Sequence, residues 1–156
     1  MRRHDREVTD PAKIREIIAA CTCCRLGLCG GDLAYIVPMN YGFQERDGHY
    51  TFYFHSAQEG RKMDLIRKTG WASFELDRGH EIIEHPNSSH CSARYECIMG
   101  VGRITLLEDR EEKKAALAAL MLHDTGRDDW EFEDAVVDRT AVIRLEVEEL
   151  TCKVRA

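Results

Sequence analysis

Apolar and polar residues alternate along much of the chain, and this alternation predicts strands with one buried face. The clearest case lies near the C-terminus. There Ala141, Ile143, Leu145 and Val147 alternate with Val142, Arg144, Glu146 and Glu148. A strand that is buried on one face and wet on the other is typical of an antiparallel sheet.

The same pattern predicts six strands, at 25–29, 34–43, 49–56, 70–77, 94–109 and 140–154. Asp47-Gly48 is a hairpin-turn signal, and Gly30-Gly31-Asp32 marks another turn. Gly100 and Gly102 fall on one strand face, which indicates a bulge or a close backbone approach. Residues 78–92 are polar and are predicted to be irregular. Short turns and half-polar strands favour an antiparallel barrel, mainly β with flanking helices, over a parallel sheet.

Three helices complete the prediction. Asp10 followed by Pro11 predicts a helix over 11–21. Ser56 with Glu59 matches a capping box, which predicts a helix from Ser56 to about Lys68. Helix spacing of apolar residues predicts a third helix over 109–124.

Length and charge limit the function classes. The 156 residues are expected to form a single domain, 1–156. A net charge of −6 argues against binding to nucleic acids or anionic membranes. No apolar run is long enough to span a membrane, and no signal peptide is recognisable. Seven cysteines, an odd number, then predict reduced thiols in a cytoplasmic protein.

The joint between the strand at 49–56 and the following helix has the composition of an anion site. A helix N-terminus carries unpaired N–H groups and a partial positive charge. Arg61 and Lys62 lie in the first turns, and Gly60 leaves room for a ligand. The competing interpretation is that both cations are solvated and that His55 is an ordinary exposed histidine.

Metal binding by the cysteines is not expected. The run Cys21-Thr22-Cys23-Cys24 lacks the spacing of structural zinc sites, and small buried thiols are the simpler interpretation. Glu81, Glu84 and His85 could form a ligand group, although such side chains on a polar connection are usually solvated. We expect no metal ligand and no disulfide among the cysteines.

Three segments resemble a known family. PMNYGF (38–43), YFHSAQEGRKMDLIRK (53–68) and RYECIMGVGRI (94–104) are similar to the flavin-binding split-barrel proteins. The similarity is to their pyridoxamine 5'-phosphate oxidase-like branch, which includes the nitroimidazole-resistance proteins. It covers nearly the whole chain.

The resemblance implies a six-stranded antiparallel split barrel that works as a homodimer, with FMN in a cleft between subunits. The implied cofactor-binding residues form three groups. Pro38, Met39, Asn40 and Tyr41 would line the isoalloxazine ring, largely through the backbone. His55, Ser56, Ala57, Gly60, Arg61 and Lys62 would hold the ribityl chain and phosphate. Ser92, Arg94 and Tyr95 would approach the flavin from the partner subunit.

The implied function is that of an FMN-dependent oxidoreductase that transfers two electrons to a small acceptor, with nitro-aromatic compounds as one candidate. The flavin would carry the chemistry, so no catalytic residue is assigned, with His55 the one candidate. One alternative is a non-catalytic flavin or haem carrier or sensor, with His55 or His85 as axial ligand. Another is a pyridoxamine-phosphate oxidase, although no counterpart of its C-terminal arginine motif is visible.

Overall fold

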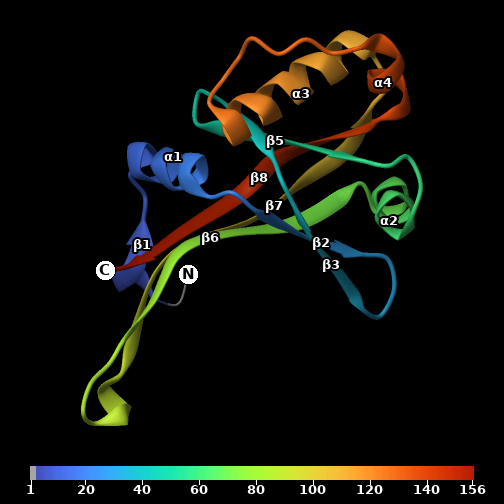
Figure 1. The fold of residues 1–156 in the computed structure, drawn as a ribbon. Coiled ribbons are helices and arrows are strands. Elements are labelled where there is room, and N and C mark those ends of the chain that lie inside the picture. Colours follow the sequence, from blue (N-terminus) through green and yellow to red (C-terminus); the bar gives the residue numbers. More distant parts are fainter. Residues whose placement is uncertain (1–2) are drawn as a thin grey trace.

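The computed structural model describes residues 3–156 and shows one antiparallel sheet flanked by helices (Figure 1). The strands follow the order β3-β2-β6-β7-β8-β5-β4, and β1 pairs with β8. Their bounds are β1 Glu7–Val8, β2 Cys24–Cys29, β3 Ala34–Met39, β4 Gly42–Arg46, β5 His49–Ser56, β6 Trp71–Ile83, β7 Ser92–Leu107 and β8 Ala141–Arg155. The helices are η1 His4–Arg6, α1 Pro11–Ala20, α2 Arg61–Thr69, η2 Ser88–His90, α3 Arg110–Thr125 and α4 Asp134–Arg139. The predicted mainly-β class is therefore confirmed.

The hydrophobic core lies inside the curved sheet. Phe52 and Phe54 of β5 point into it, and the rings of Phe52 and Phe74 pack edge to face. Ile17 and Ile18 close the core from α1, which begins at the predicted Asp10 cap. None of the helices in residues 3–156 has both the length and the apolar character needed to cross a membrane.

The glycines of β7 behave as predicted. The pairing with β8 shifts register between Val101 and Gly102, which is a β-bulge. A Cβ atom on Gly100 or Gly102 would stand 2.3 or 2.2 Å from a carbonyl oxygen of β8. Both positions therefore require glycine because the neighbouring backbone occupies the side-chain space.

The capping box predicted at Ser56 is wrong. Ser56 is the last residue of β5, where it pairs with Ala141, and α2 begins five residues later at Arg61. Gly60 is the N-cap residue, with φ of 119°. Pairing with β8 keeps Ser56 extended, and this tertiary contact prevails over the local capping preference.

Residues 78–92, predicted to be irregular, form much of a two-stranded arm. β6 continues to Ile83 and β7 starts at Ser92, with a bulge between Arg78 and Glu81. Figure 1 shows this arm extending well beyond the body of the molecule. The two strands pair through their backbones without a buried face, so hydrophobic alternation is absent from the sequence.

The single strand predicted over 34–43 is divided in two, and with the short β1 residues 3–156 contain eight strands rather than the predicted six. β3 and β4 lie at opposite ends of the sheet order, and Asn40 and Tyr41 connect them. Pro38 lies on the edge strand β3, as its missing N–H predicts. We call residues 40–42 the seam segment because they link the two edge strands of the sheet.

Candidate functional site

The start of α2 provides unpaired backbone donors. Arg61 and Lys62 are the first two residues of the helix, and no side chain caps it. The amides of Met63 and Asp64 already donate to the carbonyl oxygen of Gly60. The first two amides therefore remain for a ligand, and the space beside Gly60 is open.

Arg61 faces a hollow between α2 and the β2–β3 turn. This hollow has a volume of about 300 Å³ and is lined by Arg61, Leu65 and residues 30–33. The guanidinium carbon of Arg61 lies 4.9 Å from the centre of the Tyr35 ring, a cation–π contact that holds the side chain at the hollow.

Lys62 is half-buried, and burial lowers the pKa of its ammonium group. Neither Lys62 nor Arg61 forms an ion pair within residues 3–156, whereas Arg25, Arg78 and Arg110 each pair with two carboxylates. Because a partly desolvated cation is unfavourable without a counter-charge, this position suits an anion.

The connection that precedes α2 is fixed by two contacts of Gln58. The side-chain amide of Gln58 donates to the carbonyl oxygen of Asp138 at 2.9 Å, and Arg67 donates to the carbonyl oxygen of Gln58 at 3.1 Å. His55 is exposed and Ser56 half-buried at the end of β5. The structure thus brings the predicted residues 55–62 together around one strand–helix junction.

The residues predicted to line the flavin ring are only partly accessible. Pro38 and Asn40 are exposed, whereas Met39 and Tyr41 are buried. The Tyr41 hydroxyl donates to the backbone carbonyl oxygen of Ile18 in α1, and that of Cys21, directly after the helix, lies 3.1 Å away. The Tyr41 ring therefore belongs to the core, and only the backbone of this residue remains for a ligand.

Ser92, Arg94 and Tyr95 lie on the arm, on the opposite side of the molecule from α2 (Figure 1). Arg94 pairs with Glu81 at 3.2 Å, and the Tyr95 hydroxyl accepts a hydrogen bond from Arg6. The Ser92 hydroxyl is buried without a hydrogen-bond partner in the described part of the chain. One chain does not bring these residues to the α2 site.

The other candidate ligands lie in two separate parts of the molecule. His85 stacks near His90 at the tip of the arm, with ring centres 4.9 Å apart. No group of three or more histidine, cysteine or acidic residues in 3–156 could hold a metal ion. Cys21 and Cys24 are buried at the junction of α1 and β2, where burial raises the pKa of both thiols, that of Cys21 to about 11.

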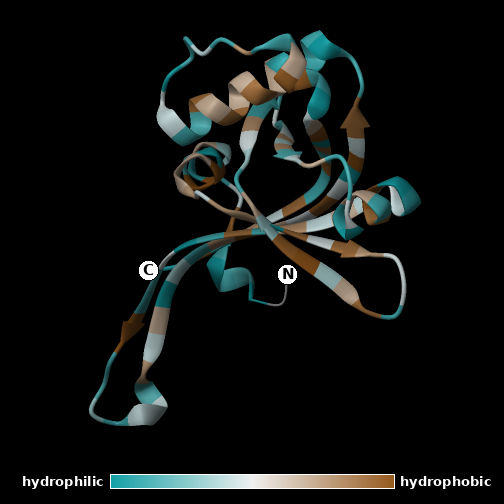
Figure 2. Ribbon diagram, turned by 45° about the vertical axis from the view of Figure 1, so that its right-hand side comes forward, coloured by the Kyte–Doolittle hydropathy of each residue, from teal (hydrophilic) through white to brown (hydrophobic). Residues whose placement is uncertain are grey.

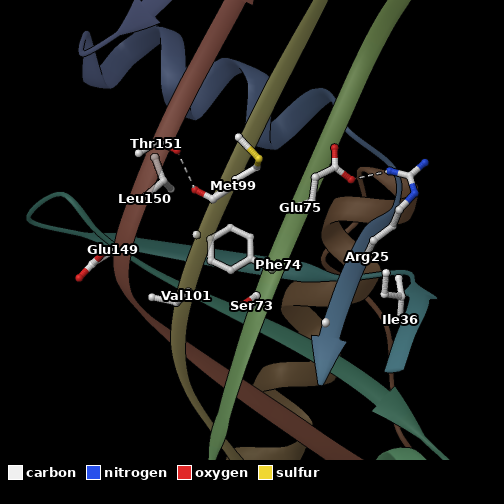
Figure 3. A pocket seen from close by; sticks show the side chains of 12 residues that line it. Arg25, Ile36, Ser73, Phe74, Glu75, Met99, Val101, Glu149, Leu150 and Thr151 are labelled. Atoms are coloured by element: carbon white, nitrogen blue, oxygen red, sulfur yellow. Dashed lines mark hydrogen bonds and ion pairs between the residues drawn. The ribbon is translucent and has the colours of Figure 1, made fainter. Parts of the chain in front are cut away.

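A second hollow lies on the outer face of the sheet, and sequence analysis missed it (Figure 3). This outer groove has a volume of about 580 Å³ and crosses β3, β2, β6, β7 and β8. Gly27 and Ser73 pair at its centre, where small side chains leave the space open. Ile36 and Met99 border it and are 67% and 43% exposed. In Figure 2 apolar colouring follows the β2–β3 hairpin out beyond the body of the molecule.

Comparison with known proteins places this geometry in a family. A family model described as pyridoxamine 5'-phosphate oxidase matches residues 10–154. A search of curated proteins finds no match. A structure provisionally described as a 5-nitroimidazole antibiotic resistance protein, from Bacteroides thetaiotaomicron, is 32% identical, with a TM-score of 0.82, covering 95% of this chain and 86% of that one.

Two more distant structures share the fold. A flavocytochrome from Azotobacter vinelandii is 18% identical with a TM-score of 0.81, covering 100% of this chain and 72% of its own. An FAD-binding protein from Mesorhizobium loti is 19% identical with a TM-score of 0.68, covering 97% of this chain and 98% of its own. The chain belongs to the pyridoxamine 5'-phosphate oxidase-like family of flavin-binding split-barrel proteins.

Proposed function

We propose that this chain binds FMN at the start of α2 and acts as an FMN-dependent oxidoreductase on a small acceptor. Its 32% identity to a protein described in terms of nitroimidazole resistance supports a nitro-aromatic compound as that acceptor. FMN, when bound, supplies two-electron redox chemistry. The residues of the chain bind and orient it.

The observation that carries the proposal is the pair of cations at the first two positions of α2. Positive side chains at a helix N-terminus oppose the helix dipole, at a cost of ~0.3–1 kcal/mol each. Arg61 and Lys62 lie there without an acidic partner in residues 3–156, and Lys62 is half-buried. A bound phosphate would convert this unfavourable arrangement into a favourable one.

The junction fits a phosphate in chemical terms. The free amides of Arg61 and Lys62 would donate to phosphate oxygens, and the two side chains would supply the counter-charge. Gly60 leaves the approach open because nothing lies within 4 Å of the place where its Cβ would be. His55 and Ala57, which are exposed, and half-buried Ser56 adjoin the same end of β5.

We further propose that the protein is a homodimer whose outer groove is covered by the second copy. The groove exposes Ile36 and Met99 between polar ends, with an Arg25–Glu75 ion pair at 2.8 Å on one side and Glu149 on the other. An apolar centre with a polar rim is the usual anatomy of a protein interface. Dimerisation would also allow the arm of one copy to reach the site of the other.

Comparison of FMN with riboflavin tests the site, because riboflavin lacks the phosphate. Titration calorimetry should show that Arg61→Ala weakens FMN binding by about 10- to 150-fold, the equivalent of ~1.5–3 kcal/mol for a charge-assisted hydrogen bond. Riboflavin binding should be unchanged. Lys62→Ala should cost less because a lysine acts as a point charge rather than a fork.

Arg46→Ala is the matched control, since Arg46 is an exposed arginine at the end of β4, away from α2. Its FMN affinity should equal that of the unmodified protein. Equal losses of FMN and riboflavin in Arg61→Ala, or no loss of either, would refute the α2 site. If the protein prefers FAD to FMN, the assignment of FMN as the cofactor is wrong. The effect of Arg61→Ala would then still decide whether the phosphate binds at the start of α2.

A further inference from the structure

Three successive residues of the seam segment contact the C-terminal half of α3. The Asn40 side-chain amide donates to Asp124 at 3.2 Å. Nδ1 of His123 lies 2.6 Å from the carbonyl oxygen of Tyr41. A Cβ atom on Gly42 would stand 2.3 Å from the backbone nitrogen of Leu120, so strand and helix are in direct backbone contact. The C-terminal half of α3 therefore packs directly against the seam segment.

His123 is the central contact. A carbonyl oxygen can only accept, so Nδ1 must carry the hydrogen and donate it to Tyr41. The His123 side chain is only 6% exposed, and its ring packs on Tyr41 and Phe43 at centre distances of 4.4 and 5.7 Å. The buried N–H of His123 and the Tyr41 carbonyl oxygen, which lies between two strands, are therefore hydrogen-bonded to each other. Leaving either group without a partner would be costly.

The position of the seam segment depends on few other contacts. Tyr41 lies after the end of β3 and before the start of β4, outside the ladders of both strands. Because these strands occupy opposite ends of the sheet order, no strand pairing sets the path between them. The Tyr41 side chain is anchored to the C-terminal end of α1 through Ile18 and Cys21, and its backbone is anchored to α3 through His123.

We propose that His123 is a positioning residue for the flavin ring. Its hydrogen bond fixes the backbone of Tyr41, which lies in the segment that the family resemblance places against the isoalloxazine ring. This inference rests on the proposed function, but it concerns the ring and not the phosphate. The effect of losing the hydrogen bond should therefore be the same for FMN and riboflavin, unlike the effect of Arg61→Ala.

Two variants separate positioning from packing. His123→Leu keeps an apolar side chain against Tyr41 and Phe43 but removes the donor. His123→Asn places an amide nitrogen where Nδ1 stood but loses the ring. Each variant is purified without flavin and titrated with FMN and with riboflavin, and thermal unfolding of the flavin-free protein reports on stability.

We expect His123→Leu to weaken both ligands equally, by about fivefold, the equivalent of one hydrogen bond of ~1 kcal/mol. His123→Asn should bind both ligands at nearly the original affinity although it is the less well packed variant. The inference is overturned if His123→Leu binds riboflavin as tightly as the original protein, or if the affinities of both variants simply follow their unfolding temperatures. Failure of the unmodified protein to bind any flavin would instead refute the proposed function.

Discussion

Gly42→Ala should destabilise the protein because the space for a side chain is already occupied. A Cβ atom at this position would stand 2.3 to 2.5 Å from backbone atoms of Ala119 and Leu120 in α3. These are backbone atoms of a 16-residue helix that is capped by Asp109 at its start and by Gly126 at its end. The helix cannot yield locally, so it would have to move away from β4 as a unit.

Overpacking of this kind costs ~1–3 kcal/mol, and contact with rigid backbone places Gly42→Ala at the upper end. For a domain of this size, 3 kcal/mol lowers the unfolding temperature by about 6–12 °C. Gly31→Ala is the matched control, because Gly31 has open space around it and no positive φ. It should be neutral or slightly stabilising, by ~0.4–1 kcal/mol, through reduced freedom of the unfolded chain. Calorimetric unfolding temperatures of the two variants that agree within the error would refute this reasoning.

Two further predictions concern acid stability and assembly. Burial opposes the charge of Glu96, but hydrogen bonds from Lys13 and Arg78 outweigh it and lower its pKa. Glu96 therefore stabilises the fold above the pKa that it has in the unfolded chain, and this contribution is lost as the pH falls through the lower pKa of the folded state. In urea titrations, the free energy of unfolding of Glu96→Gln should decline less between about pH 5 and 3 than that of the unmodified protein. Light scattering of the FMN-loaded protein at micromolar concentration should give twice the chain mass of 17.9 kDa. Ile36→Lys in the outer groove should shift the mass toward that of a monomer, whereas the control Leu122→Lys on α3 should leave it unchanged. A flavin-loaded monomer would contradict the homodimer proposal.

Elements with strong periodicity or clear turn residues could be predicted from the sequence. The alternation from Ala141 to Val147 correctly predicted β8, and Asp10-Pro11 predicted the start of α1. Asp47-Gly48 predicted the turn between β4 and β5. These signals are local, and the tertiary structure agrees with them. Ser56 shows the opposite case, because pairing with Ala141 extends β5 through the expected cap. No loss of a helix cap is therefore expected in Ser56→Ala.

The candidate site was only partly predictable for the same reason. Arg61 and Lys62 adjoin Gly60 in the sequence, so their gathering at a helix start needed no tertiary information. His123 gave no signal because its partner Tyr41 lies 82 residues away and the contact involves a backbone oxygen. The outer groove depends on Gly27 and Ser73 facing each other across two strands, and that register cannot be read from either strand alone.

The site and the assembly proposals are linked through the geometry of a single chain. Arg61 and Lys62 lie at the start of α2, whereas Ser92 and Arg94 lie on the arm across the molecule (Figure 1). A flavin at α2 can meet the arm only if a second copy supplies it. Disrupting the dimer should therefore remove the contribution of Ser92 and Arg94 to flavin binding. Arg61→Ala should still weaken FMN binding more than riboflavin binding. If both contributions survived in a monomer, the arm would have to fold back over its own chain, which its extended pairing from Glu81–Arg94 to Ile83–Ser92 does not favour.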